Sequence, residues 1–212
     1  NVSFEDAARR TGQMAYDLKY AGAPIFFSWP SQASEIGYTI DENNVTWAVP
    51  HLKQFLEDIR TKTGVKSLNI IAHSMGNRAV THVLKELYLE YQNEGRLFNQ
   101  VILAAPDVDA DVFKSDLAPK ITKIVEQLTL YASSNDRALV ASRNVHGHPR
   151  AGESGDNLVI VDGLDTIDVT GIDTSLLGHS YYGDSDSIVA DIYEVLHRGH
   201  SPGNRPRLQA TF

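Results

Sequence analysis

Ser74 lies where a short apolar run gives way to a helical pattern, a position that suits a serine nucleophile. The apolar run, Ser67 to Ala72, predicts a buried strand, and apolar residues at helical spacing follow from Ala79 onward. A serine hydroxyl is a poor nucleophile at neutral pH, so it needs a neighbouring base and backbone donors that face the developing oxyanion. A tight strand-to-helix turn exposes such a serine, and the spacing therefore predicts a nucleophile at Ser74.

The residues two positions before and after Ser74 are small, as a tight turn requires. They are Ala72 and Gly76, which give Ala-x-Ser-x-Gly where the usual nucleophile turn has Gly-x-Ser-x-Gly. The backbone N–H of Met75, at the start of the following helix, is the expected oxyanion donor. The competing interpretation is that Ser74 only caps this helix, because serine is a favoured N-cap residue.

A carboxylate that could orient a histidine follows a later expected strand, Gln127 to Ala132. Asp136 lies in the loop at the carboxyl end of that strand, on the sheet edge where Ser74 is expected. A carboxylate there would fix the histidine tautomer and stabilise the imidazolium. Asp136 could instead cap the helix that follows or pair with Arg137. The competing acids, which follow the preceding strand, are Asp107 and Asp109.

The order of the eight histidines along the chain favours His179 as the general base. It lies beyond the last expected strand and before the last expected helix, where a loop-borne base approaches a serine turn. His146 and His148 lie in a segment without periodicity, and their spacing is a weak metal signal without a carboxylate cluster nearby. The sequence therefore predicts no metal site and no organic cofactor.

Short apolar runs alternate with helical patterns along the whole chain. The expected strands are Pro24 to Ser28, Ser67 to Ala72, Gln100 to Ala104, Gln127 to Ala132 and Leu158 to Val161. The expected helices include one that begins at an N-cap, Ser3, and two more over Val45 to Ile59 and Ile188 to Leu196. This alternation predicts an α/β fold, a mainly parallel sheet with helices on both faces and a catalytic edge at the carboxyl ends of the strands.

Length and composition suit one α/β domain, because the chain has 212 residues of which 42% are hydrophobic. We expect that domain over residues 1–197 and an extended tail over 198–212. Residues 141–157 lack periodicity and are expected to form a plain connection, the alternative being a loop over the site. A net charge of −8 argues against nucleic acid and anionic membrane surfaces as partners. Without cysteine there is no disulfide and no thiolate nucleophile, and no apolar run reaches membrane-spanning length.

Five segments together resemble the successive motifs of a bacterial α/β-hydrolase family, catalogued chiefly as a domain of unknown function with esterase or lipase activity expected. They are Phe26–Ser31, Ala72–Arg78, Ala104–Asp107, Tyr131–Leu139 and Gly178–Tyr181. The resemblance covers nearly the whole chain. It implies Ser74 as nucleophile, Asp136 as acid and His179 as base, and it leaves both the cytoplasm and the cell envelope open as compartments.

Members of that family begin with a strand ending in His-Gly-aromatic-Asn, whose loop supplies the second oxyanion donor. This chain starts at the position of the final asparagine, Asn1, so the N-terminal strands and that donor are expected upstream. One missing donor lowers the rate roughly 10²–10³-fold. A sheet edge without its upstream strands would pair with another copy, so a homo-oligomer is an expected state.

Together these features predict a serine hydrolase that cleaves small-molecule carboxylic esters through an acyl-enzyme intermediate. Ser28, Trp29 and Tyr181 are expected to line the substrate pocket, although Trp29 equally suits a core position. The same triad would also serve a thioesterase, an amidase or a lysophospholipase. Outside enzymes, the alternative is a non-catalytic binding or scaffold module of hydrolase fold.

Overall fold

A computed structural model describes residues 2–34, 37–170 and 185–210 of the chain. Contacts within the chain divide it into two compact units. The first unit comprises Asn1–Asn44 and Ile172–Phe212, and the second comprises Val45–Gly171. The single domain over residues 1–197, with a tail over 198–212, stays a prediction.

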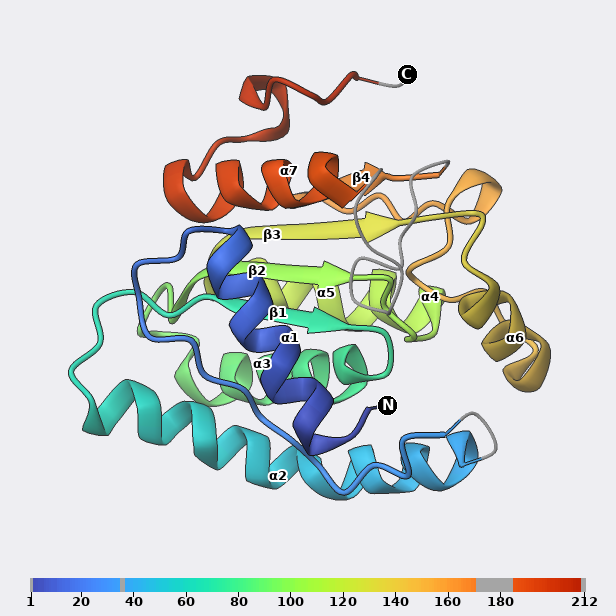
Figure 1. Cartoon of the computed structure of the whole chain (residues 1–212), viewed down its shortest axis with the longest axis horizontal. Helices are drawn as coiled ribbons and strands as arrows, with labels where there is room; N and C mark the ends of the chain where they lie inside the picture. The colour runs from blue at the N-terminus through green and yellow to red at the C-terminus, as the bar shows by residue number, and fades with distance from the viewer. Residues whose placement is uncertain (1, 35–36, 171–184, 211–212) are drawn as a thin grey trace. The chain divides into compact units, whose positions relative to one another are not determined.

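The second unit contains a four-stranded parallel sheet whose strands lie side by side in chain order (Figure 1). The strands are β1 (Ile70–His73), β2 (Phe98–Ala104), β3 (Val125–Ala132) and β4 (Leu164–Asp168). One row of paired residues crosses all four strands, and it runs through Ala72, Leu103, Leu130 and Thr166. The carboxyl ends of the strands therefore meet at one edge, and the predicted parallel α/β class is confirmed.

The two central strands, β2 and β3, carry the core of the second unit. Their fully buried residues include Val101, Ile102, Leu103, Leu128 and Leu130. Near-continuous apolar runs of this kind are what strands buried on both faces require.

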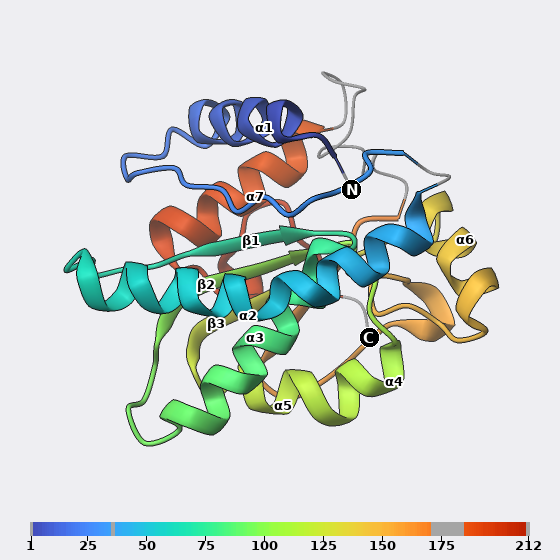
Figure 2. The same ribbon diagram turned by 90° about the horizontal axis from the view of Figure 1, so that it is seen from below.

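One helix immediately precedes the first strand, and others connect successive strands. They are α2 (Tyr38–Lys62), which leads into β1 and begins in the first unit, α3 (Gly76–Tyr91), α4 (Ala110–Val112), η1 (Phe113–Leu117), α5 (Ala118–Ile121), α6 (Arg137–His146) and η2 (Gly155–Asn157). Helix α3 buries Val80, Val83, Leu84 and Leu87, which share one face at helical spacing. Helices α3 and α5 pack together and lie on the same side of the sheet (Figure 2).

The first unit contains α1 (Phe4–Asp17), α7 (Ser185–Arg198) and the short η4 (Pro202–Asn204). Helix α1 begins after the predicted cap, because the Ser3 hydroxyl accepts a hydrogen bond from the Asp6 N–H at 3.1 Å. The chain beyond α7 is anchored to that helix by a buried ion pair, in which Arg205 Nη1 lies 3.0 Å from Asp191 Oδ2. No helix in the three described ranges is both long and apolar enough to cross a bilayer.

Two expected strands are wrong. The segment Pro24 to Ser28 is irregular, because its apolar residues make no hydrogen-bonded ladder with another described strand. The segment Leu158 to Val161 is not a strand either, and β4 begins at Leu164. Gly163 turns the chain at a φ of 80°, and the Leu164 N–H donates to the Val161 carbonyl at 3.1 Å.

The expectation of a plain connection over residues 141–157 is also wrong in part. Helix α6 continues to His146 and ends at Gly147, whose φ of 78° forms the left-handed cap. Arg150 and Ala151 beyond it are buried. This segment is therefore packed into the second unit.

Asp116 of η1 provides a test of how α3, η1 and α5 are joined. Its carboxylate pairs with Lys120 and with Lys85, whose Nζ is 2.5 Å away. Hydrogen bonds from Lys120 and then Lys85 lower the pKa of Asp116 to about 2. A depressed folded-state pKa stabilises the fold above the unfolded value of about 3.9, and this stabilisation is lost as the pH falls through the folded pKa.

We therefore expect the Asp116 carboxyl carbon to titrate near pH 2 by NMR. Asp116→Asn should lower the free energy of unfolding more at pH 6 than at pH 2. A midpoint close to 4 would contradict this pairing.

Candidate active site

Ser74 occupies the turn between β1 and α3, as predicted, and its backbone is strained. Its φ of 50° lies in the left-handed region, which costs a residue with a side chain roughly 1–2 kcal/mol. Such conformations persist where surrounding contacts impose them, and they cluster at active sites. Its hydroxyl does not cap α3, because the N-cap residue is Met75 and no side chain caps this helix. The interpretation of Ser74 as a helix cap is therefore wrong.

Hydrogen bonds to the end of β2 hold the turn in this conformation. The Ser74 N–H donates to the Ala104 carbonyl at 3.0 Å. The Ser74 carbonyl accepts from Asn77 N at 3.1 Å, from Asn77 Nδ2 at 3.0 Å and from Asp107 N at 3.3 Å. Asn77 is fully buried, and its Nδ2 also donates to the Ala104 carbonyl at 3.1 Å. The backbone of Ser74 is therefore restrained from both sides.

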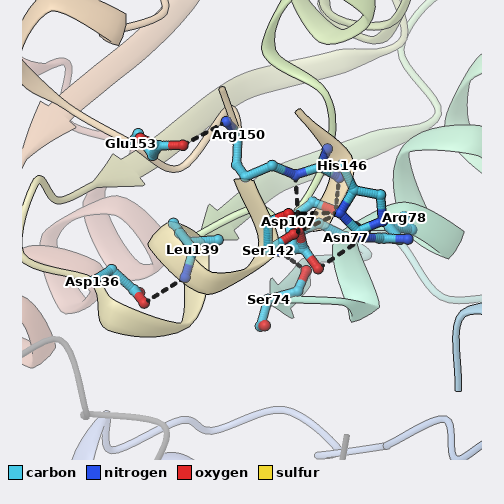
Figure 3. A network of polar contacts seen from close by, with 10 residues as sticks. All are labelled: Ser74, Asn77, Arg78, Asp107, Asp136, Leu139, Ser142, His146, Arg150 and Glu153. Atoms are coloured by element: carbon cyan, nitrogen blue, oxygen red, sulfur yellow. Dashed lines mark hydrogen bonds and ion pairs between the residues drawn. The ribbon is translucent and has the colours of Figure 1, made fainter. Parts of the chain in front are cut away.

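The Ser74 hydroxyl and the Met75 N–H are the two groups at the turn that could take part in a reaction. The Ser74 hydroxyl has no hydrogen-bond partner in the described part of the chain, and in Figure 3 it points away from the neighbouring charged residues. The Met75 N–H likewise has no acceptor there, as expected for a donor at the start of a helix. The turn thus presents a hydroxyl next to an amide donor that no described residue occupies.

A buried ionic network lies beside the turn (Figure 3). We call Asp107, Arg78, Arg150 and Ser142 the Asp107 network. Asp107 is 2% exposed, and its two carboxylate oxygens accept from Arg78 Nη2 at 3.0 Å and from Arg150 Nε at 2.9 Å. The Ser142 hydroxyl donates to the second oxygen at 2.5 Å. The Asp107 carbonyl also accepts from Arg78 Nε at 2.8 Å and Arg150 Nη2 at 3.2 Å.

Only some residues of the Asp107 network could be predicted from the sequence. Asp107 follows a predicted strand, and Arg78 lies one helical turn after Ser74, so both could have been expected at this edge. Arg150 lies in a segment without periodicity and offers no such signal.

Asp136 lies after β3 and caps α6. Its Oδ1 accepts from Ala138 N at 2.9 Å and from Leu139 N at 3.1 Å, which confirms the capping interpretation. Its other oxygen makes no hydrogen bond to the described residues. The residue is half-buried. One oxygen of Asp136 thus stays available to a further donor.

The remaining predicted residues are His179, Tyr181, Ser28 and Trp29, and their roles stay predictions. His179 and Tyr181 lie in residues 171–184, outside the described ranges. Ser28 and Trp29 belong to the first unit, where they line a pocket of about 660 Å³. The other lining residues are Val2, Phe4, Phe26, Pro30 and Ser31. Within the described residues, no group of three or more His, Asp or Glu side chains could hold a metal ion.

Comparison with known proteins shows which family the chain matches. Over residues 1–197 the chain matches the family described as "Alpha/beta hydrolase of unknown function (DUF900)". A curated relative from Nostoc sp. (strain PCC 7120), described as "Uncharacterized protein alr1448", is 28% identical over 148 residues. The match covers 56% of this chain and 38% of that relative, so the chain spans well under half of the relative's length.

The strain at Ser74 predicts an unusual order of stability among its variants. Ser74→Gly should be more stable than Ser74→Ala by about 1 kcal/mol, because glycine adopts a positive φ without steric cost. Chemical denaturation measures both variants. Ala141→Gly, in the exposed interior of α6, is the control and should lose about 1 kcal/mol. A Ser74→Gly variant less stable than Ser74→Ala would contradict the left-handed conformation.

Proposed function

The chain belongs to the family of alpha/beta hydrolases of unknown function (DUF900), and we propose that it is a serine hydrolase that cleaves carboxylic esters. In this proposal Ser74 is the nucleophile, His179 the general base and Asp136 the acid. The observation that carries the proposal is the strained Ser74 turn, whose hydroxyl and Met75 N–H both lack a hydrogen-bond partner among the described residues.

The proposed reaction passes through an acyl-enzyme. Ser74 Oγ attacks the ester carbonyl while His179 takes the hydroxyl proton, and the Met75 N–H binds the oxyanion of the tetrahedral intermediate. The intermediate collapses to the acyl-enzyme, and the leaving alcohol receives the proton from His179. A water molecule, deprotonated by His179, then attacks the acyl group and releases the carboxylic acid and Ser74.

The hydrogen bonds of the two candidate carboxylates favour Asp136 over Asp107 as the acid. Both oxygens of Asp107 already accept hydrogen bonds from arginines. Within the described ranges, Asp136 accepts hydrogen bonds from the helix N-terminus through Oδ1 and none through Oδ2, so Oδ2 can accept the Nδ1–H of a histidine. Asp136 also follows β3, whose carboxyl end meets the same sheet edge as that of β1.

We propose that Ser28 and Trp29, which line the pocket of the first unit, contact the substrate. The aromatic residues of this pocket, Phe4, Phe26 and Trp29, provide apolar surface for an acyl or alcohol group. Tyr181 is proposed as a third contact.

Labelling with a small fluorophosphonate tests the nucleophile without a known substrate. We expect mass spectrometry to find one adduct, on Ser74, because the reagent reacts with activated serines. Ser74→Ala should show no adduct, and it should also lose hydrolysis of p-nitrophenyl acetate. An unlabelled wild-type chain would contradict the proposal and favour the non-catalytic module.

Asp136→Asn tests the acid. We expect kcat for p-nitrophenyl acetate to fall about 10⁴-fold, because an amide in this place favours the wrong histidine tautomer. Asp109→Asn is the matched control, since Asp109 also caps a helix through one oxygen, with Asp111 N and Val112 N both at 3.0 Å. Asparagine is an equally good cap, so both variants should keep their stability. Equal losses of activity in the two variants would remove Asp136 from the triad.

A further inference from the structure

Two neighbouring strands end in strained residues at the catalytic edge. Ser74 follows β1 with a φ of 50°, and Ala105 follows β2 with a φ of 44°. Left-handed conformations at residues with side chains need surrounding contacts that leave no alternative. The loop that begins at Ala105 carries Asp107, whose N–H binds the Ser74 carbonyl. Whatever restrains this loop therefore also restrains the proposed nucleophile.

Residues 149–154, which we call the 149–154 segment, pack directly on this loop. The Gly152 N–H donates to the Pro106 carbonyl at 2.9 Å, and the Ala151 N–H donates to the Val108 carbonyl at 2.8 Å. A Cβ on Gly152 would lie 2.6 Å from the Ala105 carbonyl carbon, which no real contact allows. The close approach of the two backbones thus requires glycine at this position.

Arg150 connects the 149–154 segment to Asp107. Its side chain is 6% exposed, and its guanidinium binds both the carboxylate and the carbonyl of Asp107. Its own backbone N–H donates to Glu153 Oε1 at 2.8 Å. The second oxygen of Glu153 pairs with Arg143 Nη1 at 2.6 Å. Arg150 is therefore fixed at its backbone and at its guanidinium.

The same segment contacts the loop that bears the proposed acid. The Ser133 N–H, directly after β3, donates to the Gly152 carbonyl at 2.9 Å. Three consecutive strand ends are thus connected through the 149–154 segment and the Asp107 loop.

We infer that Arg150 is a positioning residue for Ser74. It holds Asp107 so that the Asp107 N–H can bind the Ser74 carbonyl and maintain the strained turn. Desolvation offsets much of the attraction within a buried ion pair, so net stability alone does not account for this one, although removing one partner would leave the other charge buried and unpaired. The catalytic part of this inference rests on the proposed function, whereas the restraint on the Ser74 backbone does not.

Arg150→Met and Arg150→Lys test the inference in the full chain. We expect faster backbone hydrogen exchange in peptides covering residues 74–78 and 105–110 of Arg150→Met. Fluorophosphonate labelling of Ser74 should slow about 10²-fold, the effect of a misplacement of about 1 Å. For p-nitrophenyl acetate, kcat should fall while KM stays the same. Arg150→Lys should recover part of each loss, because its ammonium can still reach one Asp107 acceptor.

Arg205→Met is the matched control, because Arg205 also forms a buried ion pair, with Asp191 in the first unit. It should lower the melting temperature and leave exchange at residues 74–78 and the labelling rate unchanged. Wild-type exchange at residues 74–78 in Arg150→Met would overturn the inference, and so would equal losses in Arg205→Met. If the methionine variant does not fold, Arg150→Lys decides through the same exchange measurement.

The two proposals fail in different ways. A wild-type chain without an adduct on Ser74 would defeat the proposed function, and with it the catalytic part of the inference. Hydrogen exchange would still show whether Arg150 restrains Ser74.

Discussion

The carbonyl oxygen of Ser74 accepts three hydrogen bonds, from the backbone and side chain of Asn77 and from the backbone of Asp107. These bonds hold the residue in a conformation that its side chain disfavours. The turn can then expose the hydroxyl and leave the Met75 amide open. Without this restraint the chain between β1 and α3 would relax, and both groups would lose their placement.

This restraint depends on charges buried away from water. Moving an ion out of water costs several kcal/mol even after relaxation, so Asp107 is tolerated inside the second unit only with its hydrogen bonds satisfied. Arg78, which precedes Asp107 in the chain, and Arg150, which follows it, both donate to its carboxylate. Ser142 adds a third donor. Arginine suits this role because its planar fork can bind a carboxylate and a carbonyl at once.

Three aspartates that follow β2 and β3 show how environment separates chemically identical groups. Asp109 and Asp136 each bind a helix N-terminus through one oxygen. Both carboxylate oxygens of Asp107 accept hydrogen bonds from arginines. These three carboxylates differ in the donors that the fold places around them, and the residue type alone does not predict which donors those are. A role for Asp136 beside His179 is consistent with this distinction.

Features that depend on neighbours along the chain could be predicted from the amino-acid sequence alone. Alternating apolar runs predicted β2, β3 and the start of α3, and the Ser3 cap predicted where α1 begins, because periodicity and capping are local. The small residues around Ser74 predicted its turn. Recognisable motifs also identified the hydrolase family, which the match over residues 1–197 confirms.

Features that depend on distant partners became evident only in the folded chain. The apolar run that begins at Leu158 suits a strand as well as the segment that begins at Leu164. Only the second segment pairs with β3, and it forms β4. The contact between Arg150 and Asp107 joins residues 43 positions apart. Its signal is absent from the sequence, because an arginine in an aperiodic segment is buried only when the folded chain brings a carboxylate to it.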